Sequence, residues 1–248
     1  MRDLAPPLRT VRAVVLDTDG VITDSAQLHA EAWKAVFDGF LQEHPPRQAT
    51  DRRPFDLGVD YPRYVDGKAR RDGAAAFLAS RGVYPAPATI EAVAAEKDRR
   101  YTERLHRGAT VPAYAGTVSL LHALLGSGKL LAAASASLHA RELLTRAHVL
   151  DLFDAVVDGK EAARLELRGK PAPDLFLEAA RRLRTDPADA AVVEDALAGV
   201  EAGRRGGFAL VIGVDRTAGR KRTPELLRHG ADLVITDLGE LLKEGAVT

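Results

Sequence analysis

The sequence contains no cysteine. This absence excludes disulfide bonds, thiolate metal sites and thiol nucleophiles together. Basic and acidic residues balance at 35 each, so the composition gives no general attraction to nucleic acid or to an acidic membrane. No apolar run approaches the roughly 20 residues that span a bilayer, and residues 1–7 lack the apolar core of a signal peptide. We therefore expect a soluble, cytoplasmic protein that binds neither nucleic acid nor a membrane, and nothing requires more than a monomer.

What the sequence does contain is material for a sizeable core. Hydrophobic residues make up 46% of 248 positions, which allows one large domain or two modest ones. Residues 11–16 form a short apolar run that is typical of a buried parallel strand. Asp17 and Asp19 follow it directly, and Gly20 then breaks the strand. The carboxyl end of a strand is where open α/β sheets bind ligands, although Asp-Gly alone is equally common in ordinary turns.

The chain after residue 111 alternates between predicted helices and predicted strands. The strands are expected at residues 129–134, 155–157, 190–193, 209–214 and 233–236. The helices are expected at residues 118–125, 138–147, 169–183 and 196–205. This alternation favours a parallel, doubly wound sheet, so the predicted fold class is α/β with a Rossmann-like core.

The middle of the chain has a different pattern. Residues 25–41 and 89–106 read as helices, a shorter helix ends at Gly82, and residues 42–62 read as a loop rich in Pro, Arg and Asp. No strong strand is expected there. The sequence therefore predicts a core made of residues 1–26 and 107–248, with an all-helical insertion at residues 27–106.

Polar groups recur where the predicted strands of the core end. After Asp17 and Asp19 they are, in chain order, Ser135, Ser137, Glu194 and Asp195, with Lys170 at the start of a helix before the last pair. Carboxylates are the hard oxygen ligands that Mg²⁺ prefers, and hydroxyl groups can hold phosphoryl oxygens. A lysine offsets the charge that develops in transfer, while one carboxylate attacks phosphorus and another moves a proton. The pattern predicts a phosphoryl-transfer site.

These motifs resemble those of the haloacid dehalogenase superfamily, and in particular its β-phosphoglucomutase branch. The resemblance covers the first motif at residues 17–25, Ser135-Ala136-Ser137, Lys170 within Gly-Lys-Pro-Ala-Pro-Asp, and Glu194-Asp195 within Glu-Asp-Ala-Leu-Ala-Gly-Val. Thr18 departs mildly from the pattern, which usually has Leu or Phe at that position. The fold implied by the resemblance is a Rossmann-like core with a helical cap inserted after the first strand.

The resemblance also implies roles for individual residues. Asp17 would become an aspartyl phosphate, and Asp19 would be the general acid and base. One Mg²⁺ ion would be held by Asp17, Glu194, Asp195 and the backbone carbonyl of Asp19. The transferring phosphoryl group would be held by Ser135, the backbone of Ala136 and Lys170.

The helical insertion resembles the cap of the β-phosphoglucomutase branch. Its implied substrate-binding residues are His29, Trp33, Arg70 and Lys97, together with Ser137 of the core. Arg70 would hold the phosphate that is not transferred, as a bidentate guanidinium can, but the adjacent Arg71 could serve instead. Asp66 stands where members of the branch can carry a lysine. A packed surface histidine remains the plain alternative for His29, and a solvated helix face remains the alternative for Lys97.

The resemblance implies a Mg²⁺-dependent phosphotransferase acting on sugar phosphates. The reaction expected is conversion of β-glucose 1-phosphate to glucose 6-phosphate through glucose 1,6-bisphosphate. A phosphatase that hydrolyses a hexose phosphate or another small phosphoester is the first alternative. A phosphoacceptor signalling module, whose output is the aspartyl phosphate itself, is the second.

Overall fold

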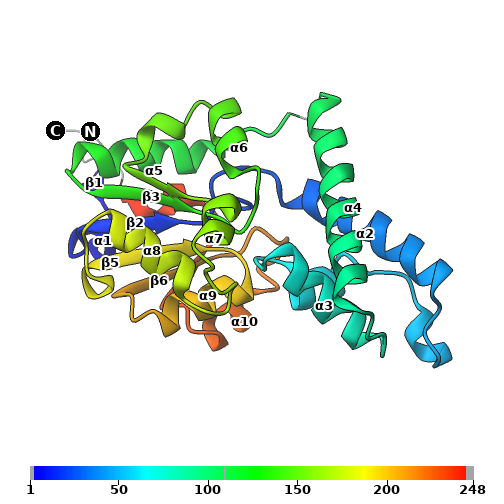
Figure 1. Cartoon of the computed structure of the whole chain (residues 1–248). Helices are drawn as coiled ribbons and strands as arrows, with labels where there is room; N and C mark the ends of the chain where they lie inside the picture. Colours follow the sequence, from blue (N-terminus) through cyan, green and yellow to red (C-terminus); the bar gives the residue numbers. More distant parts are fainter. Residues whose placement is uncertain (1–2, 109, 244–248) are drawn as a thin grey trace. The chain divides into compact units, whose positions relative to one another are not determined.

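A computed structural model describes residues 3–108 and 110–243. The chain divides into two compact units, which are described separately (Figure 1). Unit 1 consists of the described parts of Met1–Asp24 and Val111–Thr248, and unit 2 of those of Ser25–Thr110. Among the described residues, no helix combines the length and the apolar character needed to cross a membrane.

Unit 1 is built on a parallel sheet of six strands in the order β4-β3-β2-β5-β6-β7. The strands are β2 (Ala13–Leu16), β3 (Leu130–Ala134), β4 (Ala155–Val157), β5 (Ala190–Glu194), β6 (Leu210–Val214) and β7 (Leu233–Ile235). The strand β2 lies between β3 and β5, with Val15 opposite Ala132 on one side and Val192 on the other. The ends of these three strands therefore lie side by side, so the residues that follow them are brought close together.

Helices cover both faces of this sheet (Figure 1). They are α5 (Ala115–Gly126), α6 (Ala140–Arg146), α7 (Gly159–Arg164), α8 (Asp174–Arg182), α9 (Leu197–Arg205) and α10 (Thr223–Arg228). Alternate residues of β2 face opposite sides, because side chains along a strand point to opposite faces. Val14 joins one hydrophobic cluster with α5 and α6, and Val15 joins another with α8 and α9. This layered arrangement confirms the predicted α/β class.

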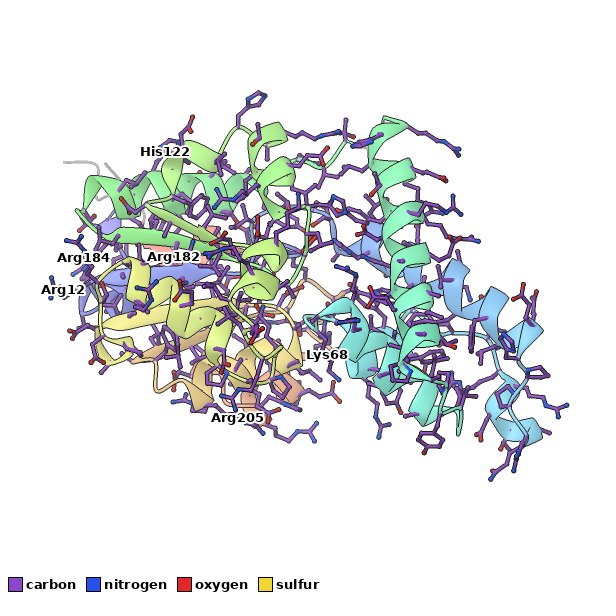
Figure 2. All side chains as sticks on the ribbon, viewed as in Figure 1. Arg12, Lys68, His122, Arg182, Arg184 and Arg205 are labelled. Atoms are coloured by element: carbon purple, nitrogen blue, oxygen red, sulfur yellow. The ribbon has the colours of Figure 1, made fainter. Side chains whose placement is uncertain are left out.

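The amino and carboxyl ends of the strands define two edges of the sheet. Arg12 and Arg184 precede β2 and β5 in the chain, and their side chains point outward at the amino ends of these strands (Figure 2). The polar residues that follow the strands therefore gather at the opposite edge.

Some short elements of unit 1 were not predicted from the sequence. The short strands β1 (Asp3–Leu4) and β8 (Leu242–Lys243) pair antiparallel, and α1 (Pro6–Arg9) follows β1. Leu4 and Leu8 are buried and complete one of the two hydrophobic clusters. The helices α7 and α10 were also not predicted from the sequence. Elements of two to six residues show no measurable periodicity, so their positions are set by tertiary packing.

Unit 2 contains three α-helices among its described residues, namely α2 (Ala26–Glu43), α3 (Arg70–Ser80) and α4 (Pro87–His106). A short 3₁₀-helix, Ala49–Arg52, and a π-helical turn, Tyr61–Val65, lie between α2 and α3. Aromatic rings fill the core: the Phe37 ring lies 4.2 Å from that of Phe77 and 4.8 Å from that of Trp33. Such pairs stabilise the unit beyond their buried area.

The segment between α2 and α3 was predicted to be a loop, and a buried carboxylate orders it. Asp60 is fully buried. It accepts two hydrogen bonds of 2.7 Å from Arg53 and one of 2.7 Å from Arg81, and the backbone N–H of Asp56 donates a fourth. Although burial opposes ionisation, the hydrogen bonds from Arg53 and Asp56 hold the pKa of Asp60 below its ordinary value.

Asp60→Asn should lower the free energy of unfolding of unit 2 by about 3 kcal/mol, because buried Arg81 would lose the carboxylate with which it is paired. A carboxyl with a lowered folded pKa stabilises above its unfolded pKa of about 3.9, and this contribution is lost as the pH falls through the folded pKa. Wild-type unit 2 should therefore lose stability below about pH 4, and the variant less so. Urea unfolding followed by the fluorescence of Trp33, the single tryptophan, measures both effects.

Asp56→Asn provides the control, since Asp56 is exposed and accepts hydrogen bonds from the backbone N–H groups of Gly58 and Val59, which an amide oxygen can replace. Equal stability losses in the two variants would contradict the role assigned to Asp60.

Candidate active site

The first acidic motif lies directly after the central strand β2. The backbone N–H of Asp17 still donates to Val193 of β5 at 3.0 Å, so the sheet fixes its backbone. The chain then turns, because the N–H groups of Ile22 and Thr23 both donate to the carbonyl of Thr18. Within the turn the backbone N–H of Asp19 donates to Asp17 Oδ2 at 3.0 Å. The two predicted catalytic carboxylates are thus held by strand pairing and by a closed turn.

Lys170 lies at the centre of the acidic groups and is itself fully enclosed. Its ammonium donates to Asp17 Oδ1 at 2.5 Å and to Glu194 Oε2 at 3.1 Å. The ammonium also lies 4.6 Å from the centre of the Phe176 ring. Burial disfavours the charged amine, but the carboxylates of Asp17 and Glu194 outweigh it and raise the pKa of Lys170 above its ordinary value. The side chain therefore carries a positive charge at neutral pH.

Glu194 is the last residue of β5 and is fully buried. Burial and the nearby charge of Asp17 raise its pKa well above the ordinary value, and Lys170 opposes this rise. The helix α9 passes very close to it: a Cβ added to Gly199 would lie 2.1 Å from Glu194 Cδ. Only glycine at this position leaves room for the carboxylate.

Three of the carboxylates could hold a metal ion together. Oxygens of Asp17, Glu194 and Asp195 all lie within 4.8 Å of one another. Burial and the crowding of these carboxyl groups around one ammonium raise the pKa of Glu194, and a divalent cation bound among them would favour their ionised forms. Mg²⁺ prefers such hard oxygen ligands and keeps part of its coordination for water and phosphate. The residues present therefore fit Mg²⁺.

The second polar segment follows β3, next to β2. Ser135 is buried; its hydroxyl accepts from the backbone N–H of Ser137 at 3.1 Å and lies 3.4 Å from Asp19 Oδ2. The Ser137 hydroxyl in turn accepts from the N–H of His139. A Cβ on Gly159 would lie 2.6 Å from the carbonyl oxygen of Ala136, so a glycine is needed beneath this loop as well. Unit 1 thus brings all the core residues predicted from the sequence to one edge of its sheet.

The predicted cap residues lie in unit 2, where His29, Trp33 and Lys97 form one cluster with Tyr101. The Lys97 ammonium lies 2.7 Å from His29 Nδ1, 4.7 Å from the centre of the Tyr101 ring and 5.7 Å from that of Trp33. Lys97 and His29 are both buried, so the solvated helix face considered for Lys97 is wrong, and so is the surface position considered for His29. Tyr101 was missed, although its spacing of four residues from Lys97 places it on the same helix face.

Arg70 and Arg71 occupy the first turn of α3 and share one acidic neighbour. Arg71 pairs closely with Glu91, while the Arg70 guanidinium lies 3.9 Å from the same carboxylate. Arg71 is the more exposed of the two, at 67% against 34% for Arg70. Asp66, at the position where members of the branch can carry a lysine, is buried. The roles of these unit 2 residues toward a substrate stay a prediction.

Comparison with known proteins assigns the chain to a family. A family model described as haloacid dehalogenase-like hydrolase matches residues 11–207. The chain belongs to this family. The resemblance to this family is therefore confirmed. The chain is an enzyme, either a phosphotransferase or a phosphatase, which disfavours the signalling module.

Individual relatives agree with the assignment. A β-phosphoglucomutase of Mycobacterium tuberculosis is 43% identical over 242 residues, covering 94% of this chain and 92% of the relative. A β-phosphoglucomutase of Bacillus subtilis is 32% identical, covering 94% and 93%. Among solved structures, a β-phosphoglucomutase from Clostridium difficile has a TM-score of 0.73 at 24% identity and covers 93% of both chains, which supports the fold.

Thr18→Val should raise the free energy of unfolding of unit 1 by about 1 kcal/mol, because a buried hydroxyl without a partner costs about that much. Thr18 is fully buried between the two catalytic candidates, and its Oγ1 has no hydrogen-bond partner among the described residues. Thermal unfolding followed by circular dichroism measures the effect.

Thr117→Val is the matched control, since Thr117 is equally buried but donates to the carbonyl of Val21 at 2.8 Å. This variant should lose about 1 kcal/mol. A loss of stability in Thr18→Val would mean that the Thr18 hydroxyl has a partner after all.

Proposed function

We propose that the protein is a Mg²⁺-dependent β-phosphoglucomutase, which converts β-glucose 1-phosphate to glucose 6-phosphate through an aspartyl phosphate on Asp17. The observation that carries this proposal is the enclosed contact of Lys170 with Asp17 and Glu194 beside Asp195. The name of the relative that is 43% identical over 94% of the chain supports the choice of substrate.

Asp17 is suited to act as the nucleophile. Lys170 donates to its Oδ1 and the backbone N–H of Asp19 donates to its Oδ2, so the carboxylate is fixed in direction. In phosphorylation, a bond forms between an Asp17 oxygen and phosphorus while the bond from phosphorus to the sugar oxygen breaks. When bound by Asp17, Glu194 and Asp195, Mg²⁺ supplies positive charge to the phosphoryl oxygens. Lys170 adds a second, permanent positive charge.

Asp19 is suited to move the proton. Its carboxylate lies 3.4 Å from the Ser135 hydroxyl, at the edge where the phosphoryl group would be held. Asp19 would take the proton from the 6-hydroxyl of β-glucose 1-phosphate when phospho-Asp17 transfers its phosphoryl group there, which gives glucose 1,6-bisphosphate. After the bisphosphate turns over, Asp17 takes the phosphoryl group from carbon 1, Asp19 returns the proton, and glucose 6-phosphate leaves. Ser135, the backbone of Ala136 and Ser137 would hold phosphoryl oxygens.

The unit 2 residues would bind the rest of the substrate. When Lys97 is protonated it donates to Nδ1 of His29, so the ring proton lies on Nε2 and the pair carries one positive charge. The faces of Trp33 and Tyr101 border this charge and suit the carbon face of a sugar. Arg70 would bind the phosphate that is not transferred, since a planar guanidinium can bind two phosphate oxygens at once.

A phosphatase is the second candidate, because the family is described as one of hydrolases. The same carboxylates and lysine would transfer the phosphoryl group from Asp17 to water instead of a sugar hydroxyl. A mutase must therefore keep water from the phosphoenzyme.

Phosphorus NMR separates the two candidates. The protein is mixed with Mg²⁺, β-glucose 1-phosphate and a trace of glucose 1,6-bisphosphate. Glucose 6-phosphate without inorganic phosphate is the expected result. Inorganic phosphate as the main product would instead identify a phosphatase, and an unchanged spectrum would remove this substrate.

Arg70→Ala should raise the KM for the bisphosphate at least tenfold, since a charge-assisted hydrogen bond contributes about 1.5–3 kcal/mol. Hydrolysis of p-nitrophenyl phosphate, which has no second phosphate, should change little. Arg71→Ala is the matched control one residue away and should leave both reactions close to wild type. Equal losses in both reactions for Arg70→Ala, or a larger loss for Arg71→Ala, would contradict the role of Arg70.

A further inference from the structure

Arg216 lies two residues after the end of β6, close to the acidic residues, and the mechanism above does not use it. Its Nε donates to the carbonyl oxygen of Gly20 at 2.9 Å. Another guanidinium nitrogen donates to the carbonyl of Thr236 and to Asp237, each at 3.2 Å. One arginine therefore joins the turn after β2 to the segment after β7.

The carbonyl that accepts from Arg216 belongs to Gly20, a position that leaves no room for a side chain. Gly20 directly follows Asp19 and has a φ of +80°, a conformation that residues with a Cβ rarely adopt. A Cβ at this position would lie 2.1 Å from Asp195 Oδ2, so the Gly20 backbone packs directly on that carboxylate. The orientation of the Gly20 peptide therefore affects both Asp19, which precedes it, and Asp195, which lies against it.

Arg216 also stacks on Tyr114, with its guanidinium carbon 3.5 Å from the ring centre. The Tyr114 hydroxyl donates to Asp24 Oδ1 at 2.9 Å. Burial raises the pKa of Tyr114 well above its ordinary value, and Asp24 raises it further, so the phenol remains a donor throughout the working pH range. Arg216, Tyr114 and Asp24 thus form one connected set within unit 1.

This set lies where the chain leaves unit 1 and returns to it. Residues 22–24 pair with residues 112–114: the backbone N–H of Tyr114 donates to the Ile22 carbonyl, and the backbone N–H of Asp24 donates to that of Pro112, each at 3.0 Å. A bridge between Thr23 and Ala113 lies between these two bonds. The outgoing and returning segments are therefore joined to each other, and Tyr114 connects them to Arg216.

We propose that Arg216 is a positioning residue of the active site, which fixes the turn of Asp19 and Gly20 and couples it through Tyr114 to the paired segments 22–24 and 112–114. Arginine suits this position because a planar group with several donors can bond to carbonyls while its face stacks on a ring. A lysine could keep the charge but not all of these contacts. One guanidinium nitrogen of Arg216 is buried and has no hydrogen-bond partner among the described residues, so a large stabilising contribution is not expected.

The first test compares Arg216→Lys with Arg220→Lys. Arg220 lies on the same loop and also donates to a carbonyl near β7, that of Val234 at 2.7 Å, but it is exposed and does not contact Gly20. For Arg216→Lys we expect kcat for p-nitrophenyl phosphate to fall about tenfold with KM within about twofold, since small displacements of reacting groups reduce turnover. Arg220→Lys should match wild type.

Hydrogen exchange of the folded protein gives a readout that is independent of turnover. In Arg216→Lys, the backbone amides of residues 18–24, Ala113 and Tyr114 should exchange faster, while those of residues 130–136 should not change. A merely stabilising role would instead lower the unfolding temperature and speed exchange throughout unit 1, with normal turnover for each folded molecule. That pattern, or an unchanged kcat in Arg216→Lys, would overturn the proposal.

The stack on Tyr114 is tested by two substitutions. Tyr114→Leu should reproduce the loss of turnover in Arg216→Lys, and the double variant should be no worse than either single variant, because both changes break one connected set. Tyr114→Phe keeps the ring beneath the guanidinium and should keep kcat within about twofold of wild type. Losses that simply multiply in the double variant would contradict the coupling.

The inference rests on the proposed function only in taking Asp19 as the acid and base. The two can fail separately. Wild-type protein that hydrolyses p-nitrophenyl phosphate but does not isomerise β-glucose 1-phosphate would overturn the proposed mutase, and the comparison of Arg216→Lys with Arg220→Lys would still decide the role of Arg216.

Discussion

The enclosed ammonium of Lys170 is the interaction on which the candidate site depends. Asp17 and Glu194 approach each other in surroundings from which water is largely excluded, and two carboxylates so placed cannot both remain ionised without a compensating positive charge. Lys170 bonds to both and supplies that charge. The contact also fixes the direction of the Asp17 carboxylate, the group that we propose as the nucleophile. Because the carboxyl groups of Asp17, Glu194 and Asp195 outnumber this one ammonium, their oxygens can still accommodate a metal ion.

The sheet order explains how residues so far apart in sequence meet. The strand β2 has β3 and β5 as its direct neighbours, and the site residues follow these three strands. An insertion directly after β2 would be expected to disturb the nucleophile, but the turn of residues 17–24 closes on itself through the Thr18 carbonyl and pairs with residues 112–114. The chain therefore leaves and re-enters unit 1 at one place, which is the arrangement in which insertions are best tolerated.

Much of unit 1 could be predicted because its signals are local. Each strand of the main sheet is a short apolar run, and its observed ends fall within two residues of those expected. Most core site residues follow from position alone, since they lie at or just after the ends of β2, β3 and β5. Lys170 is the exception, because the helix expected to start there, α8, begins only at Asp174. The structure of unit 2 was harder to predict, because it is stabilised by contacts between residues that are distant in sequence. Asp60 is fixed by Arg81, 21 residues away, in a stretch whose composition indicates a loop. Lys97 lies on a helix rich in charge, and only its packing against Trp33 and Tyr101 explains its burial.

The two buried lysines differ in a way that bears on the chemistry. Lys170 is surrounded by carboxylates, so its charge is neutralised within the protein and the group around it stays acidic. Lys97 contacts an imidazole and aromatic faces, none of which carries the full negative charge of a carboxylate. An acidic group requires a cation before it can accept a phosphoryl group, whereas a cationic and aromatic group can bind an anionic sugar directly. This difference supports our proposal that the acidic group carries out phosphoryl transfer and that the residues around Lys97 bind the sugar of a sugar phosphate.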